Sequence, residues 1–162
     1  MKSCLHLLAL IVPALMSGTA IAQTEPQAQP PQSRPAESAG QLTFPTLDGD
    51  TQQVAPDEIW RIRAASTRDE PAGTIVIDYA YERLYVRDTL ESVVEKVSGA
   101  RPLKRFTLPS GAPVYIVPGK VIGITRPISA QHHQNTRSVI VAREGQTQVR
   151  EAREAISAAL GK

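Results

Sequence analysis

Residues 75–99, IVIDYAYERLYVRDTLESVVEKVSG, combine two strand signals with one helix signal. Aliphatic residues alternate with other side chains on both sides of a polar turn, which is typical of two short strands. After Asp88, apolar residues recur at helical spacing as far as Gly99, where a glycine can end a helix. Asp88 and Glu91 have the spacing of a capping box, which predicts that the helix begins there. The stretch therefore predicts a β-hairpin followed directly by a helix.

The same order recurs in residues 139–161, VIVAREGQTQVREAREAISAALG. Upstream, Phe44, Gly49, Val54, Pro56, Ile59 and Ile62 recur 62 residues later as Phe106, Gly111, Ile116, Pro118, Val121 and Ile124. By eye, Ile75 and Ile77 align with Val139 and Val141, and Val86 aligns with Val149. Turn, strand and helix signals keep one order and the gaps fall in loops, so the pattern predicts an internal duplication.

We therefore predict a mostly β fold with two short helices, of the α+β class. It would be a tandem pseudo-repeat of antiparallel strands, residues 42–100 and 101–162, each half closed by a C-terminal helix. A half of about 55 residues is near the lower limit for independent folding. We expect two sheets and their helices to pack into one pseudo-symmetric body. Two loosely tethered lobes, with residues 101–105 as the hinge, are the alternative.

Each half resembles two known families in a glycine turn, an Ile-x-x-Ile strand and a Val-Arg-Asp step into a helix. These are the short flagellar-regulator domain of the FlbD type and the β-strands of LytTR DNA-binding domains. The shared positions are mostly core and turn residues, and they cover one half at a time. A DNA-binding role would conflict with export and with a near-neutral charge, so no function is carried over from the resemblance.

The N-terminal residues indicate export. Lys2 precedes an apolar run, and Ala20-Ile21-Ala22 matches the small-residue pattern of a cleavage site, so residues 1–22 are expected to be a signal peptide. The apolar run is shorter than the roughly 20 residues that span a bilayer, so no transmembrane anchor is expected. Residues 23–41 are rich in proline and glutamine and predict a disordered tether, with a proline-rich ligand for a partner domain as the alternative.

Composition narrows the functional classes. The single cysteine, Cys4, lies inside the expected signal peptide, so the mature chain would carry no disulfide and no thiolate nucleophile. Lysine and arginine number 18 against 16 aspartate and glutamate, interspersed along the chain. This near balance argues against nucleic acid as a partner. A periplasmic or secreted location is expected.

A binding face is predicted where aromatic and basic residues alternate with inward-pointing aliphatics on two strands. Its residues are Trp60, Arg61, Arg63, Tyr85 and Arg87. Such a face is either covered by the second half or offered to a partner, for which exposed aromatic and arginine side chains are typical contacts.

His132-His133, in the polar loop of residues 129–136, is the only other cluster of side chains that could bind a metal ion or take part in catalysis. Zinc normally takes at least three protein ligands, and no third histidine follows the expected signal peptide, so the pair is a weak metal candidate. No catalytic residue and no cofactor are predicted, because no recognised catalytic constellation is present. We expect a non-enzymatic interaction module that binds a protein of the cell envelope. The alternative is a small metal-binding protein or hydrolase using His132-His133.

Overall fold

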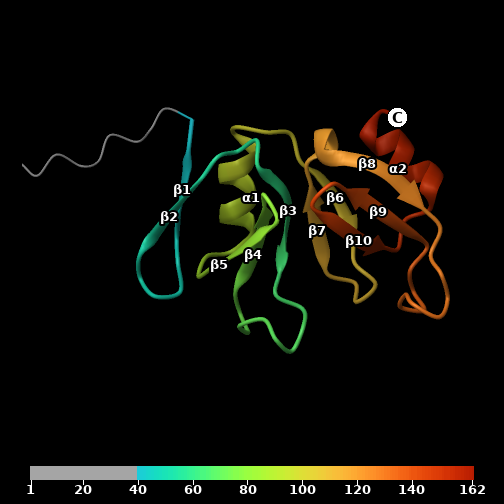
Figure 1. Ribbon diagram of the computed structural model, residues 1–162, viewed down its shortest axis with the longest axis horizontal. Coiled ribbons are helices and arrows are strands. Elements are labelled where there is room, and N and C mark those ends of the chain that lie inside the picture. The colour runs from blue at the N-terminus through green and yellow to red at the C-terminus, as the bar shows by residue number, and fades with distance from the viewer. Residues whose placement is uncertain (1–39) are drawn as a thin grey trace, which may run out of the picture. The chain divides into compact units, whose positions relative to one another are not determined.

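The computed structural model describes residues 40–162 and places ten strands, two α-helices and one short 3₁₀ helix along them (Figure 1). The protein is mostly β with two helices, which confirms the predicted α+β class. The expected signal peptide, residues 1–22, and most of the expected tether, residues 23–41, lie outside the described residues.

The first half, residues 42–100, begins with a hairpin whose turn requires glycine, because Gly49 has φ +90°. Three further strands and a helix follow. The elements are β1 (Leu42–Pro45), β2 (Thr51–Val54), β3 (Ile59–Ala64), β4 (Ile75–Tyr79), β5 (Glu82–Val86) and α1 (Leu90–Ser98).

The second half, residues 101–162, follows the same order, and Gly111 at its first hairpin turn has φ +96°. Its elements are β6 (Lys104–Thr107), β7 (Pro113–Ile116), the 3₁₀ helix η1 (Pro118–Lys120), β8 (Val121–Thr125), β9 (Ser138–Ala142), β10 (Gly145–Val149) and α2 (Arg153–Leu160).

The strands form three antiparallel sheets and not the two that the sequence led us to expect. One has five strands in the order β5-β4-β3-β7-β6, one has three in the order β10-β9-β8, and β1 and β2 pair with each other. The five-stranded sheet takes strands from both halves, because the hairpin β6–β7 joins the edge of β3. Sequence patterns show which residues form strands but not which distant edge a strand joins.

A β-bulge interrupts the pairing at one place in each half. The register of β3 against β4 shifts between Ile59 and Arg61, and that of β8 against β9 shifts between Val121 and Gly123. The extra residue in the first bulge is Trp60, and in the second it is Ile122. A bulge changes the direction in which its side chain points, so Trp60 and Ile122 can contact groups beside the edges of their sheets.

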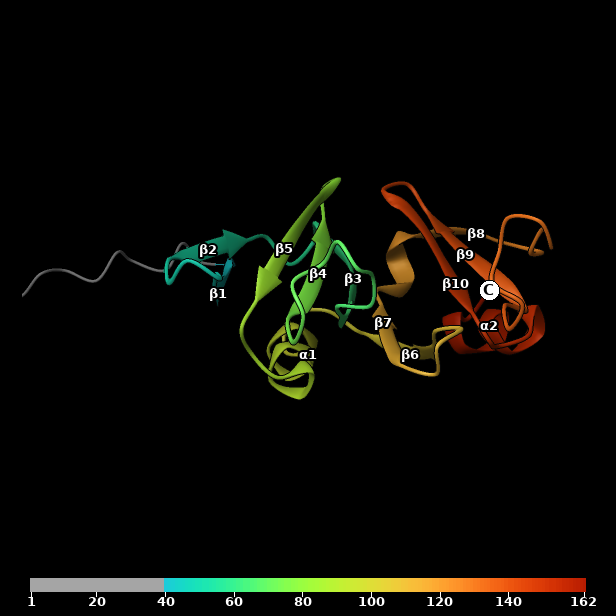
Figure 2. The ribbon, with the colours of Figure 1, turned by 90° about the horizontal axis from the view of Figure 1, so that it is seen from below.

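Each half also links the end of its first strand to its last strand. Thr46, just after β1, forms an isolated antiparallel bridge with Val86 of β5. In the second half the amide of Arg150, just after β10, donates to the carbonyl of Thr107 in β6 over 2.9 Å. Figure 2 shows the two hairpins and the strands that they approach.

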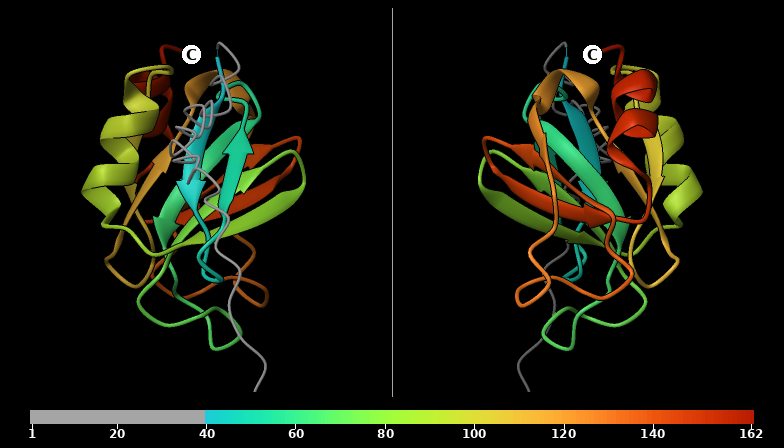
Figure 3. Two further views of the ribbon diagram at one scale, coloured as in Figure 1. Left: turned by 90° about the vertical axis from the view of Figure 1, so that its left-hand side faces the viewer. Right: turned by 90° about the vertical axis from the view of Figure 1, so that its right-hand side faces the viewer.

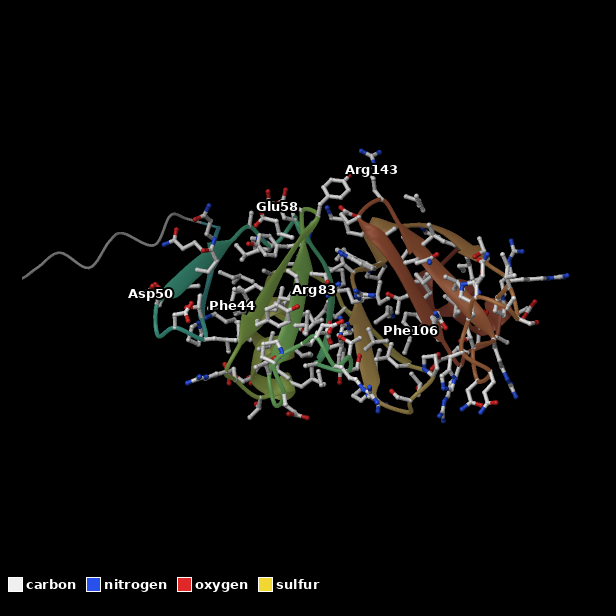
Figure 4. The ribbon with its side chains drawn as sticks, turned by 60° about the horizontal axis from the view of Figure 1, so that its bottom comes forward. Phe44, Asp50, Glu58, Arg83, Phe106 and Arg143 are labelled. Atoms are coloured by element: carbon white, nitrogen blue, oxygen red, sulfur yellow. The ribbon has the colours of Figure 1, made fainter. Side chains whose placement is uncertain are left out.

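Two apolar clusters form the core. The first contains Phe44 with side chains from β2 to β5 and from α1, and the second contains Phe106 with side chains from β7 to β10 and from α2. Figures 2 and 3 agree in placing α1 and α2 on the same side of the strands, and Figure 4 labels Phe44 and Phe106. Val93 on α1 and Ile156 on α2 are fully buried, so each helix covers its own half.

Two details of the sequence analysis were wrong. Ile75 pairs with Val86, and Ser138 pairs with Val149, so Ile77 and Ile140, and not Ile77 and Val141, hold the same position in their hairpins. The error was one residue, which moves a side chain to the other face of a strand.

The second correction concerns the start of the first helix. Thr89, and not Asp88, is the N-cap of α1, and its hydroxyl accepts from the amide of Ser92 over 3.2 Å. Asp88 instead accepts from the amide of Thr89 and the hydroxyl of Ser92. Both side chains stabilise the same turn, one residue later than predicted.

Candidate interaction site

The contact between the two halves is a strand pairing, which we call the β3–β7 joint. Arg61 pairs with Ile116, Ile62 with Tyr115 and Arg63 with Val114. The amide of Val117 extends it by donating to the carbonyl of Trp60 over 3.0 Å. In an antiparallel pair such groups alternate in direction, so the amide and carbonyl of Ile62 also face β7.

Trp60 is buried at this joint, with 3% of its surface exposed. A Cβ atom on Gly145, at the start of β10, would lie 3.3 Å from the indole ring, so the second half approaches Trp60 closely. On the other side the guanidinium of Arg61 lies 4.4 Å from the ring centroid, a cation–π distance. The Trp60 ring is therefore packed between Arg61 of the first half and Gly145 of the second.

Arg61 connects three strands through its guanidinium group. It donates to Asp78 on β4 over 2.8 Å, and to the carbonyl of Gln146 and the hydroxyl of Thr147 on β10 over 3.1 and 2.7 Å. Burial lowers the pKa of Arg61, and the hydrogen bond to Asp78 opposes that effect. Two of its three acceptors are uncharged groups of the second half, so Arg61 fixes the position of β10 against β3.

Arg63 and Glu70 form a second, deeper ion pair. Arg63 donates to both carboxylate oxygens of Glu70, one over 2.8 Å, and the amides of Ser66 and Thr67 also donate to that carboxylate. The hydrogen bond from Arg63 is the main cause that lowers the pKa of Glu70 to about 2. Arg83, labelled in Figure 4, bridges the pairs by donating to Glu70 and Asp78.

The five residues of the predicted binding face do not share one exposed surface. Trp60, Arg61 and Arg63 lie at or beside the β3–β7 joint, where the second half covers Trp60 and Arg61. Tyr85 on β5 is half-buried, and Arg87 just beyond β5 is exposed. The joint brings the first three together and leaves the other two on a different strand.

A groove of about 490 Å³ runs beside the joint. Its lining comes from both halves and includes Arg61, Arg63, Ser110, His133 and Thr147. Arg61 and Arg63 are already paired with carboxylates, and no carboxylate lines the groove. Ser110 is a turn residue whose hydroxyl accepts from the amide of Ala112 over 3.4 Å.

The His132-His133 pair takes part in local loop bonds. Nδ1 of His132 accepts from the amide of Ile128 over 2.8 Å, and Nδ1 of His133 accepts from the amide of Asn135 over 3.1 Å. Within residues 40–162, no group of three or more histidine, cysteine, aspartate or glutamate side chains is placed to hold a metal ion. The contacts of both rings are those of a structured polar loop.

Six strands pair on one side only in the part of the chain that the structure describes: β1, β2, β5, β6, β8 and β10. Single links connect the ends of β1 and β5, at Thr46 and Val86, and of β6 and β10, at Thr107 and Arg150. The open edges of β2 and β8 carry no such link to another strand. The carbonyl of Gln53 in β2 accepts from the side chain of Gln52 over 3.2 Å, as expected for a group that faces away from the ladder. Beside the β8 edge, Ile122 exposes 65% of its surface.

The sequence analysis did not single out Ile122. The 62-residue spacing of the predicted duplication could have identified it, because Ile122 stands 62 residues after Trp60. Unpaired edges invite strand addition, and proteins commonly guard them with charges, proline or a cover. The sequences of β2 (TQQV) and β8 (VIGIT) contain no charge and no proline. The C-terminal Lys162 amine donates to the carbonyl of Val121, at the very start of β8. Within residues 40–162, no strand pairs with the rest of that edge.

No family model, curated protein or solved structure matched this chain. Among the described residues, no helix has the length and apolar character needed to cross a membrane.

Proposed function

We propose that this chain is an exported, non-enzymatic interaction module that binds a protein partner in the cell envelope by strand addition. It consists of two copies of one unit: a hairpin, three antiparallel strands and a closing helix. The free edge of β8, which carries exposed Ile122, is its principal binding surface. A periplasmic or secreted location belongs to the same proposal and rests on the signal-peptide pattern of residues 1–22.

Four structural correspondences support two copies of one unit. Both halves have a positive-φ glycine at the hairpin turn, a bulge at the third strand and a link from the first strand to the last. Both also bury a core residue of the closing helix at matching places, Val93 and Ile156. Two bulges 62 residues apart in the chain, each at the third strand of its half, favour duplication over chance similarity of short β segments.

The observation that carries the binding proposal is the β3–β7 joint itself. It is a case of strand addition already completed inside the chain, since a hairpin from one unit extends the sheet of the other. β8 holds the place in the second half that β3 holds in the first, but within residues 40–162 no strand pairs with its outer edge. Strand addition at an exposed edge is a common mode of peptide recognition, with backbone hydrogen bonds supplying affinity.

Site-specific photo-crosslinking in the producing cell tests this function. A photoreactive amino acid replaces Ile122 beside the β8 edge, or Ala158 on an exposed face of α2 as the matched control. We expect a protein adduct in the envelope fraction from position 122 and none from position 158. Equal adducts at both positions, or none at 122, would contradict edge binding. Intact mass of the recovered protein tests export, with Gln23 as the expected first residue.

A further inference from the structure

We infer that the occupant of the β8 edge is the β1–β2 hairpin of a second copy of this chain, paired as β7 pairs with β3. This inference rests on the proposed function and names its partner. The two open edges that no link connects to another strand of the described chain match the two sides of the joint that it already forms once: β2 corresponds to β7, and β8 corresponds to β3. Each copy would pair its β2 edge with β8 of one neighbour and its β8 edge with β2 of another.

The internal joint specifies the register of the external one. Shifting its three pairs by 62 residues places Gly123, Ile124 and Thr125 of one copy opposite Val54, Gln53 and Gln52 of the other. The amide of Ala55 would then donate to the carbonyl of Ile122, as Val117 donates to Trp60. Lys162 holds a different carbonyl, that of Val121, and leaves this acceptor free.

The residues on both edges suit this pairing. All three residues of β2 in the joint, Gln52, Gln53 and Val54, are uncharged, and so are Gly123, Ile124 and Thr125 of β8. Gly123 stands where Arg61 stands in β3, and a Cβ atom there would meet nothing within 4 Å, so no side chain blocks the approach. No charge repulsion opposes the two edges, unlike the guarded edges of most monomeric sheets.

Exposed apolar surface lies where the joint would cover it. Ile122 is the counterpart of Trp60, which the start of β10 buries. The counterpart of Gly145 is Glu82, so the β4–β5 turn of the second copy would face Ile122. That turn carries Tyr81, which exposes 73% of its surface, the largest value among the big hydrophobic residues of the described chain. Such apolar side chains beside an unguarded edge are typical of an interface.

The resulting contact is heterologous: one copy uses the β1–β2 hairpin of its first half, and the other uses β8 of its second half. Head-to-tail contacts of this kind generate rings or open filaments, because every added copy presents a fresh edge. The pairing of three residues a side is small beside a stable interface, so we expect association that increases with concentration.

Two variants remove one edge each. Gln53 holds the position in β2 that Tyr115 holds in β7, so its backbone amide points away from β1 and toward the free edge. Gln53→Pro removes this amide donor and leaves the hydrogen bonds between β1 and β2 in place. Gln53→Ala is its control, because it keeps the amide. Ile122→Lys places a charge at the β8 edge, and Ala158→Lys adds the same charge on α2.

Sedimentation velocity of the full protein, purified in the form that the cell produces, measures the result. We expect the average mass of the wild type and of both controls to rise with concentration. Gln53→Pro and Ile122→Lys should each remain monomeric, while an equal mixture of the two should form a dimer and nothing larger, because each supplies the edge that the other lacks. Unchanged thermal unfolding of each variant shows that the fold is kept.

A wild type that stays monomeric, or a mixture that does not form the dimer, would overturn the second-copy inference. The crosslinking experiment separates this failure from that of the proposed function. An adduct from position 122 with a different protein contradicts self-association and supports edge binding. The absence of any adduct contradicts both.

Discussion

Trp60 and Ile122 occupy the same bulge position in β3 and β8, yet Trp60 is 3% exposed and Ile122 is 65% exposed. The difference has one structural cause. A hairpin of the second half pairs with β3 and brings β10 against Trp60, while within residues 40–162 nothing pairs with the outer edge of β8. Ile122 is therefore exposed because no further strand pairs with the outer edge of β8 within residues 40–162.

Stability should fall in acid through Glu70. Its pKa is lowered from 4.5 to about 2, so its contribution to folding is complete above pH 4.5 and is lost as the pH falls toward 2. Glu70→Gln should remove this part of the acid dependence and, at neutral pH, lower the free energy of unfolding by about 3 kcal/mol, because Arg63 stays buried without its partner. Urea unfolding at several pH values measures both effects. Glu95→Gln on the exposed side of α1 is the control, with a change within about 0.5 kcal/mol. An unaltered acid profile in Glu70→Gln would refute this assignment.

Gly145 should tolerate no large side chain. Its missing Cβ leaves room for the ring of Trp60, so Gly145→Val should destabilise the protein by about 1–3 kcal/mol through overpacking. The matched control is Gly123→Val, also in a strand, where nothing lies within 4 Å of an added Cβ. Thermal unfolding, together with Trp60 fluorescence, checks the pair. Equal destabilisation by both substitutions would show that the contact with Trp60 is not the cause.

The two helix starts should respond in opposite directions. Thr89 caps α1 through its hydroxyl, so Thr89→Ala should cost about 1 kcal/mol. Ala152 holds the N-cap position of α2 and has no side chain that can accept a hydrogen bond. Ala152→Thr should stabilise the protein by up to about 1 kcal/mol. Chemical denaturation of both variants measures the effects, and a loss of stability in Ala152→Thr would show that the φ and ψ angles there do not suit a capping hydroxyl.

The histidine pair separates an interaction module from a metal protein. Replacing both His132 and His133 with alanine should change the free energy of unfolding by no more than about 0.5 kcal/mol, as for most loop positions near the surface. Zinc should raise the melting temperature of the unaltered protein very little, because the two rings lack further ligands within residues 40–162. Tight stoichiometric zinc binding by calorimetry, abolished by the double substitution, would favour the metal-binding alternative.

Local pattern alone predicted much of this protein. Alternating aliphatics, helical spacing and turn glycines such as Gly49 and Gly111 identified the strands, the helices and their order, because each of these signals acts over a few residues. Errors remained where a shift of one residue leaves the pattern almost unchanged. The N-cap was placed at Asp88 where the structure has Thr89, and Ile77 was aligned with Val141 where the hairpin register gives Ile140.

Only the tertiary structure decided which edges meet. The sequence marked Trp60, Arg61 and Arg63 as a candidate binding face, but their surroundings depend on β7 and β10, which lie more than 50 residues away along the chain. It gave no sign that Ile122 would differ from Trp60 in exposure. Hydrogen bonds along a strand edge belong to the backbone and are the same for almost every residue type, so pairing between distant strands leaves little trace in the amino acids themselves.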